Sequence, residues 1–135
     1  MEQFVGKWRQ STMDFEKMKA LYAKMGAPEA ALDGQKEHWK TSYIEVAENG
    51  THWKYGNDSA PGGDATVTFD MAEKVCNRTG KGGVIKSTFE MKGDTEMVIH
   101  NPNGLKLTAK MAGHEMKLTQ TLDDVSVDTV YTKSE

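Results

Sequence analysis

The most reactive side chains do not fall into a catalytic or metal-binding pattern. Cys76 is the single cysteine, and no histidine–acid pair is evident that would activate its thiol as a nucleophile. The four histidines lack metal-ligand spacing, such as a pair four residues apart on a helix; they are His38, His52, His100 and His114. We therefore expect no catalytic residue, no metal site and no cofactor, and we interpret the protein as a non-enzyme.

Arginine-based recognition has few candidates. Only Arg9 and Arg78 are arginines, and the other 15 basic residues are lysines. Arginine is the usual choice for gripping a carboxylate or phosphate because its planar guanidinium donates two parallel hydrogen bonds. The 17 basic and 20 acidic residues leave a net charge of −3. This balance argues against a nucleic-acid-binding module, which usually carries a basic face.

The length of 135 residues predicts one domain, spanning 1–135. No run approaches the roughly 20 apolar residues of a membrane span. Residues 1–8 carry no signal-peptide pattern, and a single cysteine excludes an internal disulfide and fits a reducing compartment. We expect a cytoplasmic protein, with a secreted chain that has lost its signal as the alternative.

Two short helices are expected within about residues 14–36. Asp14 is a suitable N-cap for the first helix, and Gly26 suits its end. Pro28 is well placed at the start of the second helix, which ends near Gly34 or continues toward Lys36. Apolar side chains recur on one face of the first helix at three- and four-residue spacing: Phe15, Met18, Tyr22 and Met25.

A period of two dominates from about residue 40 onward. Asn49-Gly50 is a strong hairpin signal between strands 41–48 and 51–57. With a first strand at 4–10, the further strands are expected at 64–71, 83–91, 96–100, 105–111, 115–121 and 125–133. Strands at this spacing predict a sandwich or barrel. The tight turns favour an up-and-down barrel, with the helices covering one end.

The N-terminal motif Phe4-Val-Gly-Lys-Trp8, followed by a helix opening Asp14-Phe15-Glu16, resembles the start of the intracellular lipid-binding protein family. This family comprises the cytosolic fatty-acid-binding proteins and their retinoid-binding relatives. The likeness covers essentially the whole chain, including the Asn49-Gly50 hairpin and the final strand ending Thr129-Val-Tyr131-Thr-Lys.

The resemblance implies a mainly β fold, a ten-stranded up-and-down antiparallel barrel of the calycin type. A helix-turn-helix lid lies between its first two strands. It further implies non-catalytic binding and intracellular transport of a long-chain hydrophobic ligand, such as a fatty acid or similar lipid. Such a carrier is expected to be a monomer with possible transient membrane contact through the lid helices. A hollow barrel also explains why Leu, Ile, Val and Phe total only 22 residues.

The chain departs from the family where ligand chemistry is decided. Many members hold the lipid carboxylate with two arginines and a tyrosine. Tyr131 stands at the tyrosine position, whereas Thr129 and Met111 stand at the arginine positions. An unpaired carboxylate in a low-dielectric cavity costs several kcal/mol, and hydroxyls are only neutral donors.

Three outcomes follow for the headgroup. It points outward to lysines at the portal, or the ligand is neutral, or another polar group replaces the arginines. Gln120 is a candidate for that group if Leu118, Gln120 and Leu122 point inward, and His100 is a weaker one. The alternatives are therefore a carrier of a retinoid, sterol or haem-like ligand, or a lipocalin-type secreted carrier.

Ten residues are the expected ligand contacts. Alternation by itself indicates only that a side chain points inward, which fits a solid core equally well. The resemblance shifts the interpretation toward a cavity, because the inward face of so wide a barrel lines a ligand space. The ten are Met18, Trp53, Tyr55, Val67, Phe69, Ala109, Met111, Gln120, Thr129 and Tyr131.

Overall fold

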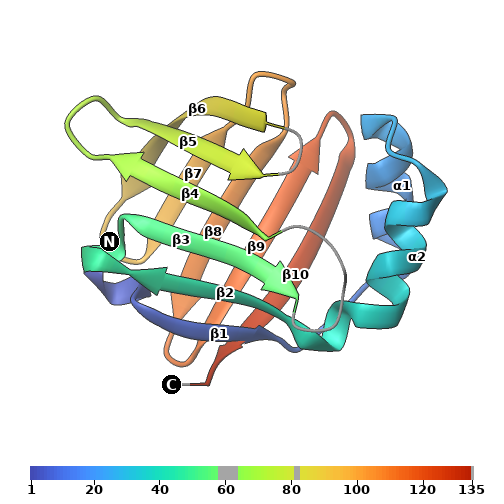
Figure 1. The fold of residues 1–135 in the computed structure, drawn as a ribbon, viewed down its shortest axis with the longest axis horizontal. Helices are drawn as coiled ribbons and strands as arrows, with labels where there is room; N and C mark the ends of the chain where they lie inside the picture. The colour runs from blue at the N-terminus through green and yellow to red at the C-terminus, as the bar shows by residue number, and fades with distance from the viewer. Residues whose placement is uncertain (58–63, 81–82, 135) are drawn as a thin grey trace.

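The computed structural model describes residues 1–57, 64–80 and 83–134, and in this part of the chain ten antiparallel strands form a closed barrel (Figure 1). Each strand pairs with its neighbour in sequence, and β1 closes the barrel against β10. The elements are β1 (Gly6–Gln10), α1 (Phe15–Met25), α2 (Glu29–His38), β2 (Ser42–Ala47), β3 (His52–Asn57), β4 (Ala65–Asp70), β5 (Val75–Gly80), β6 (Gly83–Lys92), β7 (Glu96–His100), β8 (Lys106–Ala112), β9 (Glu115–Leu122) and β10 (Val125–Lys133).

The predicted fold class is confirmed, including the two helices between the first two strands. One strand, β5, lies where the periodicity predicted none. Its apolar residues Val75 and Cys76 are adjacent rather than alternating, and the following residues are mostly polar, so a period of two is hard to see. The barrel nevertheless requires it, because β5 joins β4 to β6 through paired backbone.

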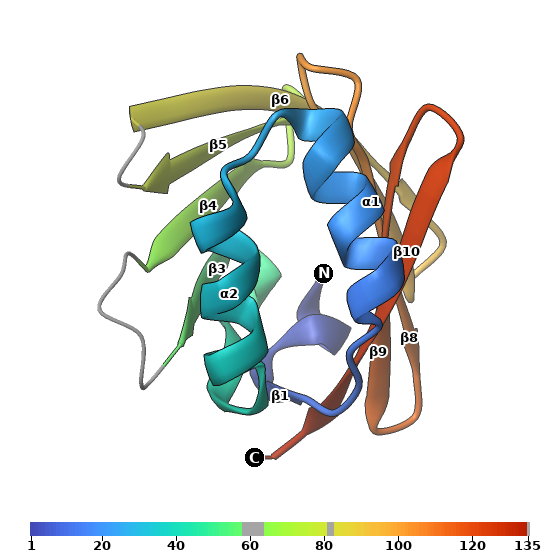
Figure 2. The same ribbon diagram turned by 90° about the vertical axis from the view of Figure 1, so that its right-hand side faces the viewer.

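Both helices lie over one open end of the barrel (Figure 2). The Asp14 side chain accepts a hydrogen bond from the Lys17 backbone N–H at 3.1 Å, which caps the start of α1. Gly26 ends this helix with a left-handed φ of 72°, a conformation that favours glycine. The second helix runs through Gly34 to His38, two residues beyond the expected limit. None of the described helices is both long and apolar enough to cross a membrane.

The expected hairpin turn after β2 is present. Asn49 adopts left-handed dihedrals, with φ 60° and ψ 25°. Gly50 also has a positive φ of 86° and lies against the backbone of Met1, where a Cβ atom would clash. The indole Nε1 of Trp53 donates a hydrogen bond to the Gly50 carbonyl at 2.7 Å. This turn therefore ties the N-terminal segment to the start of β3.

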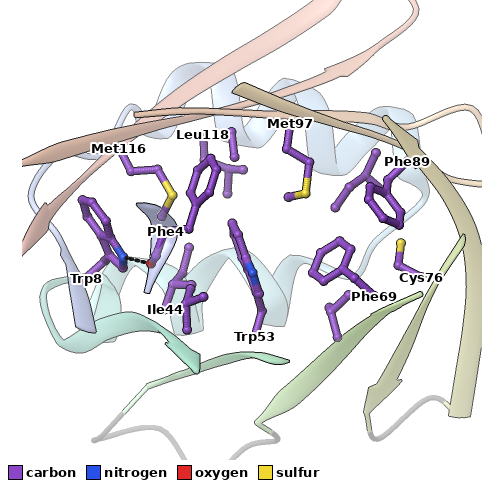
Figure 3. Close-up of a cluster of buried hydrophobic side chains, with 14 of the residues drawn as sticks. Phe4, Trp8, Ile44, Trp53, Phe69, Cys76, Phe89, Met97, Met116 and Leu118 are labelled. Carbon is purple, nitrogen blue, oxygen red and sulfur yellow. Dashed lines mark hydrogen bonds between the residues drawn. The ribbon is translucent and has the colours of Figure 1, made fainter. Parts of the chain in front are cut away.

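A dense cluster of aromatic side chains and methionines fills one part of the barrel interior (Figure 3). Phe4 packs on Trp53 with ring centroids 5.3 Å apart, and Trp53 packs on Phe69 at 5.6 Å. Phe89 continues the series, 5.0 Å from Phe69. Trp8 donates its indole N–H to the Phe4 carbonyl at 2.9 Å and is fully buried. We call the part of this cluster that lies away from the helices the packed end of the barrel.

Candidate functional site

Between the packed end and the helices the barrel holds a cavity of about 1160 Å³ that is partly open to solvent. This volume is slightly larger than the roughly 300–1000 Å³ that is usual for small-molecule sites. Its wall is built from both helices and from inward positions of most strands. The apolar part of the wall includes Val67, Ile99, Leu107 and Leu118.

Six of the ten expected contact residues line this cavity: Met18, Tyr55, Val67, Gln120, Thr129 and Tyr131. Gln120 points inward between Leu118 and Leu122, as its strand pattern predicted.

The structure does not bring the other four expected residues into the cavity wall. Trp53, Phe69 and Ala109 are buried in the packed end, and Met111 packs against it. All four positions face inward, as alternation indicated. They lie nearer the packed end of the barrel, where side chains fill the interior. The sequence therefore predicted the correct face of the sheet, but not the position of these residues along the barrel axis.

The polar groups on the cavity wall have spare hydrogen-bonding capacity. Within the described residues, the hydroxyls of Tyr55, Thr129 and Tyr131 and the amide of Gln120 make no hydrogen bond to protein. No fully buried side-chain nitrogen or oxygen in that part of the chain lacks a partner. These four groups are therefore open to the cavity space, where a ligand or water can bind them.

The tyrosines of the wall are neutral donors. Burial raises the pKa of Tyr55, and the nearby Tyr131 raises it further, while the positive charge of Arg78 opposes both. Burial likewise raises the pKa of Tyr131, with Tyr22 adding to the effect. Both phenols stay protonated at neutral pH, so they can donate hydrogen bonds but carry no charge.

The first helix is attached to the barrel by its apolar face. Leu21 is fully buried and Met18 is 5% exposed, and both pack against Leu122 and Val127 of the last hairpin. Leu21 was missing from the expected helical face, although it lies three residues after Met18 in the same spacing. Met18 also lines the cavity, so it serves both roles.

The two helices meet above the cavity. Burial raises the pKa of Tyr22 on α1, and the nearby Gln35 on α2 opposes this shift, so the two side chains lie close together. Both residues line the cavity. The helices therefore form the roof of the site as a connected pair.

Sequence reasoning missed the charged residues of the wall, which are Asp64, Arg78 and Lys86. Arg78 lines the cavity from β5, the strand that periodicity did not predict. The signal that could have found it is its position two residues after Cys76, which is buried and faces inward.

The described residues hold no cluster of three or more metal-ligating side chains. Burial raises the pKa of the Cys76 thiol to about 11, so it is protonated and weakly nucleophilic at neutral pH. The chemistry this cavity offers is an apolar wall with a few neutral donors, together with the charged side chains of Asp64, Arg78 and Lys86.

No protein-family model and no curated protein sequence matches the chain. Solved structures do. A Schistosoma mansoni fatty acid binding protein in complex with arachidonic acid has a TM-score of 0.81 at 20% identity, over 100% of this chain and 98% of that one. The REP1-NXSQ fatty acid transporter has a TM-score of 0.75 at 16% identity, over 100% and 98%. Echinococcus granulosus fatty-acid-binding protein 1 has a TM-score of 0.63 at 12% identity, over the full length of both.

These matches define the class of fold as a ten-stranded barrel roofed by two helices. The chain has the fold of the fatty-acid-binding proteins, which is the fold that its N-terminal motif and strand order predicted.

Proposed function

We propose that this protein is a non-catalytic carrier that binds a long-chain, largely apolar molecule, a fatty acid or similar lipid, inside the barrel. The observation that carries the proposal is the cavity of about 1160 Å³ between the packed end and the helices. The fold neighbours agree with it, since one of them was solved with arachidonic acid and another is a fatty acid transporter.

The apolar wall can supply the binding energy. Burying a methylene group contributes about 0.8 kcal/mol, so about ten methylenes of a lipid chain contribute roughly 8 kcal/mol. Part of this is lost to the ordering of the ligand. Side chains such as Val67, Leu107 and Leu118 provide the contact area, and Met18 can adapt its shape to different chains. Before these costs, roughly 8 kcal/mol corresponds to a dissociation constant of about 1 μM, so contacts beyond those ten methylenes must offset the costs.

The helices are the proposed entry gate. The second helix contacts mainly the first helix and the short 3₁₀ turn that precedes β2. It can therefore move without breaking the packing of α1 on the last hairpin. We propose that the carrier works as a cytosolic monomer and that the helices touch membranes when lipid is transferred.

A neutral ligand, such as an alcohol, ester, sterol or retinoid, is the alternative. Thr129 and Tyr131 offer only hydroxyls, and Met111 offers no polar group at all. A fatty acid and its methyl ester, compared side by side, separate the two classes of ligand.

The test is a titration of the delipidated protein with an environment-sensitive fluorescent fatty acid, followed by displacement with oleate. Leu107→Trp should place extra bulk in the path of the lipid chain and weaken binding. Lys106→Trp is the matched control, because it places the same ring on the outward face of β8 and should leave binding intact. Absence of saturable binding by any long-chain lipid would overturn the proposed function.

A further inference from the structure

Arg78 occupies an inward position on β5 beside apolar wall residues. Its paired residues across the sheet are Val67 on β4 and Ile85 on β6, and both line the cavity with it. Directly paired residues point to the same side of a sheet. The guanidinium is thus the polar end of an otherwise apolar row.

No protein group compensates this charge in the described part of the chain. Arg78 makes no ion pair or hydrogen bond there. Asp64 supplies the carboxylate among the described wall residues. It is paired with Lys54 instead of Arg78, because its Oδ2 lies 3.4 Å from the Lys54 amine. An arginine with five free N–H donors facing a ligand space is suited to an anion.

Tyr55 adds a neutral hydrogen-bond donor that lies close enough to be affected by the charge of Arg78. The charge of Arg78 lowers the pKa of Tyr55 against the larger raising effect of burial, which shows that the two groups interact. The residues between them are small. Ala65 pairs with Tyr55 on β4, and a Cβ added to Gly80 would only touch the Ala65 Cβ at 3.4 Å. Because Tyr55 and Arg78 line the same cavity, a headgroup inside it can face both of them.

We propose that Arg78, assisted by the Tyr55 hydroxyl, binds the carboxylate of a long-chain acid. This rests on the proposed function and narrows its ligand class to anionic lipids. The headgroup is then held from β5 and β3, by Arg78 and Tyr55, rather than by Thr129 and Tyr131 of β10. An arginine–carboxylate pair is commonly bidentate and stronger than a neutral hydrogen bond.

The exposure of Arg78 supports this placement. Arg78 is exposed although it lines the cavity, so water reaches part of its side chain. A partly hydrated pair avoids much of the desolvation cost that a fully buried ion pair carries. The lipid tail can meanwhile extend along the apolar wall.

The test compares oleate with methyl oleate on the full-length protein by displacement of a fluorescent probe. Arg78→Met should weaken oleate binding about 10- to 100-fold and change methyl oleate binding less than about twofold. Arg78→Lys should fall between, because it keeps the charge but loses the bidentate geometry.

Arg9→Met is the matched control for loss of one positive charge. Arg9 lies outside the cavity wall, donates to the Thr41 carbonyl at 3.1 Å and covers the Tyr43 ring. It should leave both affinities unchanged. Retained binding of methyl oleate by Arg78→Met reports that the variant is folded.

The outcomes separate the two proposals. If the wild-type protein binds neither lipid, the proposed function fails. If it binds both but Arg78→Met affects acid and ester equally, or neither, the carrier function stands and the Arg78 anchor is overturned.

Discussion

The packed end and the cavity end of the barrel are made by the same strands, yet they hold different side chains. On β3, Trp53 fills the packed end, whereas Tyr55 lines the cavity two residues further along. On β4, Phe69 belongs to the packed end and Val67 extends to the cavity. At the packed end ring packs against ring (Figure 3). At the cavity end the wall carries smaller apolar groups and hydroxyls without protein partners.

The comparison teaches that one barrel can separate stability from binding along its axis. The packed end buries its apolar surface within the protein itself, which stabilises the fold. The cavity end leaves apolar surface for a ligand to cover. Substitutions at the two ends should therefore differ in whether they change the free energy of unfolding or the affinity for lipid.

The largest expected effect is on stability, at the packed end. Trp53→Ala removes a ring that is 1% exposed and leaves the Gly50 carbonyl without its indole donor. It should lower the free energy of unfolding by about 3–5 kcal/mol, measured by urea denaturation. Tyr55→Phe, two residues away, should cost less than about 1 kcal/mol because its hydroxyl has no protein partner. Equal losses for the two variants would erase the distinction between the ends.

The next largest effect concerns the attachment of the first helix. Leu21→Ala opens a gap against Leu122 and Val127 and should cost about 2–3 kcal/mol. Lipid should also leave faster, as followed by stopped-flow transfer to vesicles, because the roof of the cavity is loosened. Met25→Ala is the control on the same helix, since this side chain is 37% exposed, and should cost less than about 0.5 kcal/mol. An unchanged dissociation rate in Leu21→Ala would argue against the helices as the gate.

A smaller effect is expected on the β10 side of the cavity. Tyr131→Phe removes a hydroxyl that bonds to no protein group, so the free energy of unfolding should change by less than about 1 kcal/mol. With the carboxylate held by Arg78, oleate affinity should change less than about threefold. Calorimetric titration measures this. A tenfold loss specific to the acid would place the headgroup near β10 instead.

The smallest effect should come from the exposed ion pair between Lys24 and Asp124, 3.1 Å apart, which joins the first helix to the last hairpin. Lys24 lowers the pKa of this carboxyl, so the pair persists at neutral pH and weakens only as pH falls through that lowered value. Lys24→Met should raise the lipid dissociation rate less than about twofold. The difference should vanish in about 0.5 M NaCl, where exposed charges are screened. A difference that survives the salt would point to packing rather than charge.

Much of the fold could be predicted from the sequence because local rules agree with the global structure. The capping residue Asp14, the terminating Gly26 and the Asn49-Gly50 turn each do in the structure what their types predict. The strand β5 escaped because its apolar residues are adjacent and its remaining residues are polar. Its existence follows from barrel closure, a long-range requirement that no local window contains.

The sequence predicted which side chains of the candidate site face the barrel interior, but not how far along the barrel axis they lie. Alternation placed Trp53 and Tyr55 on one side of β3, and it has no means of telling which of them faces empty space. Depth depends on strand direction and on which end the helices cover, as Figures 1 and 2 show. Arg78 was lost together with its strand, since a residue has no assigned face until its strand is recognised.

The most direct test of the central claim is a map of nuclear Overhauser contacts between ¹³C-labelled oleate and the methyl groups of the delipidated, refilled protein. The account predicts contacts from the lipid chain to Val67, Ile99, Leu107 and Leu118, and none to the outward-facing Val130. Contacts confined to surface methyl groups, or none at saturating lipid, would contradict a lipid-binding cavity at this end of the barrel.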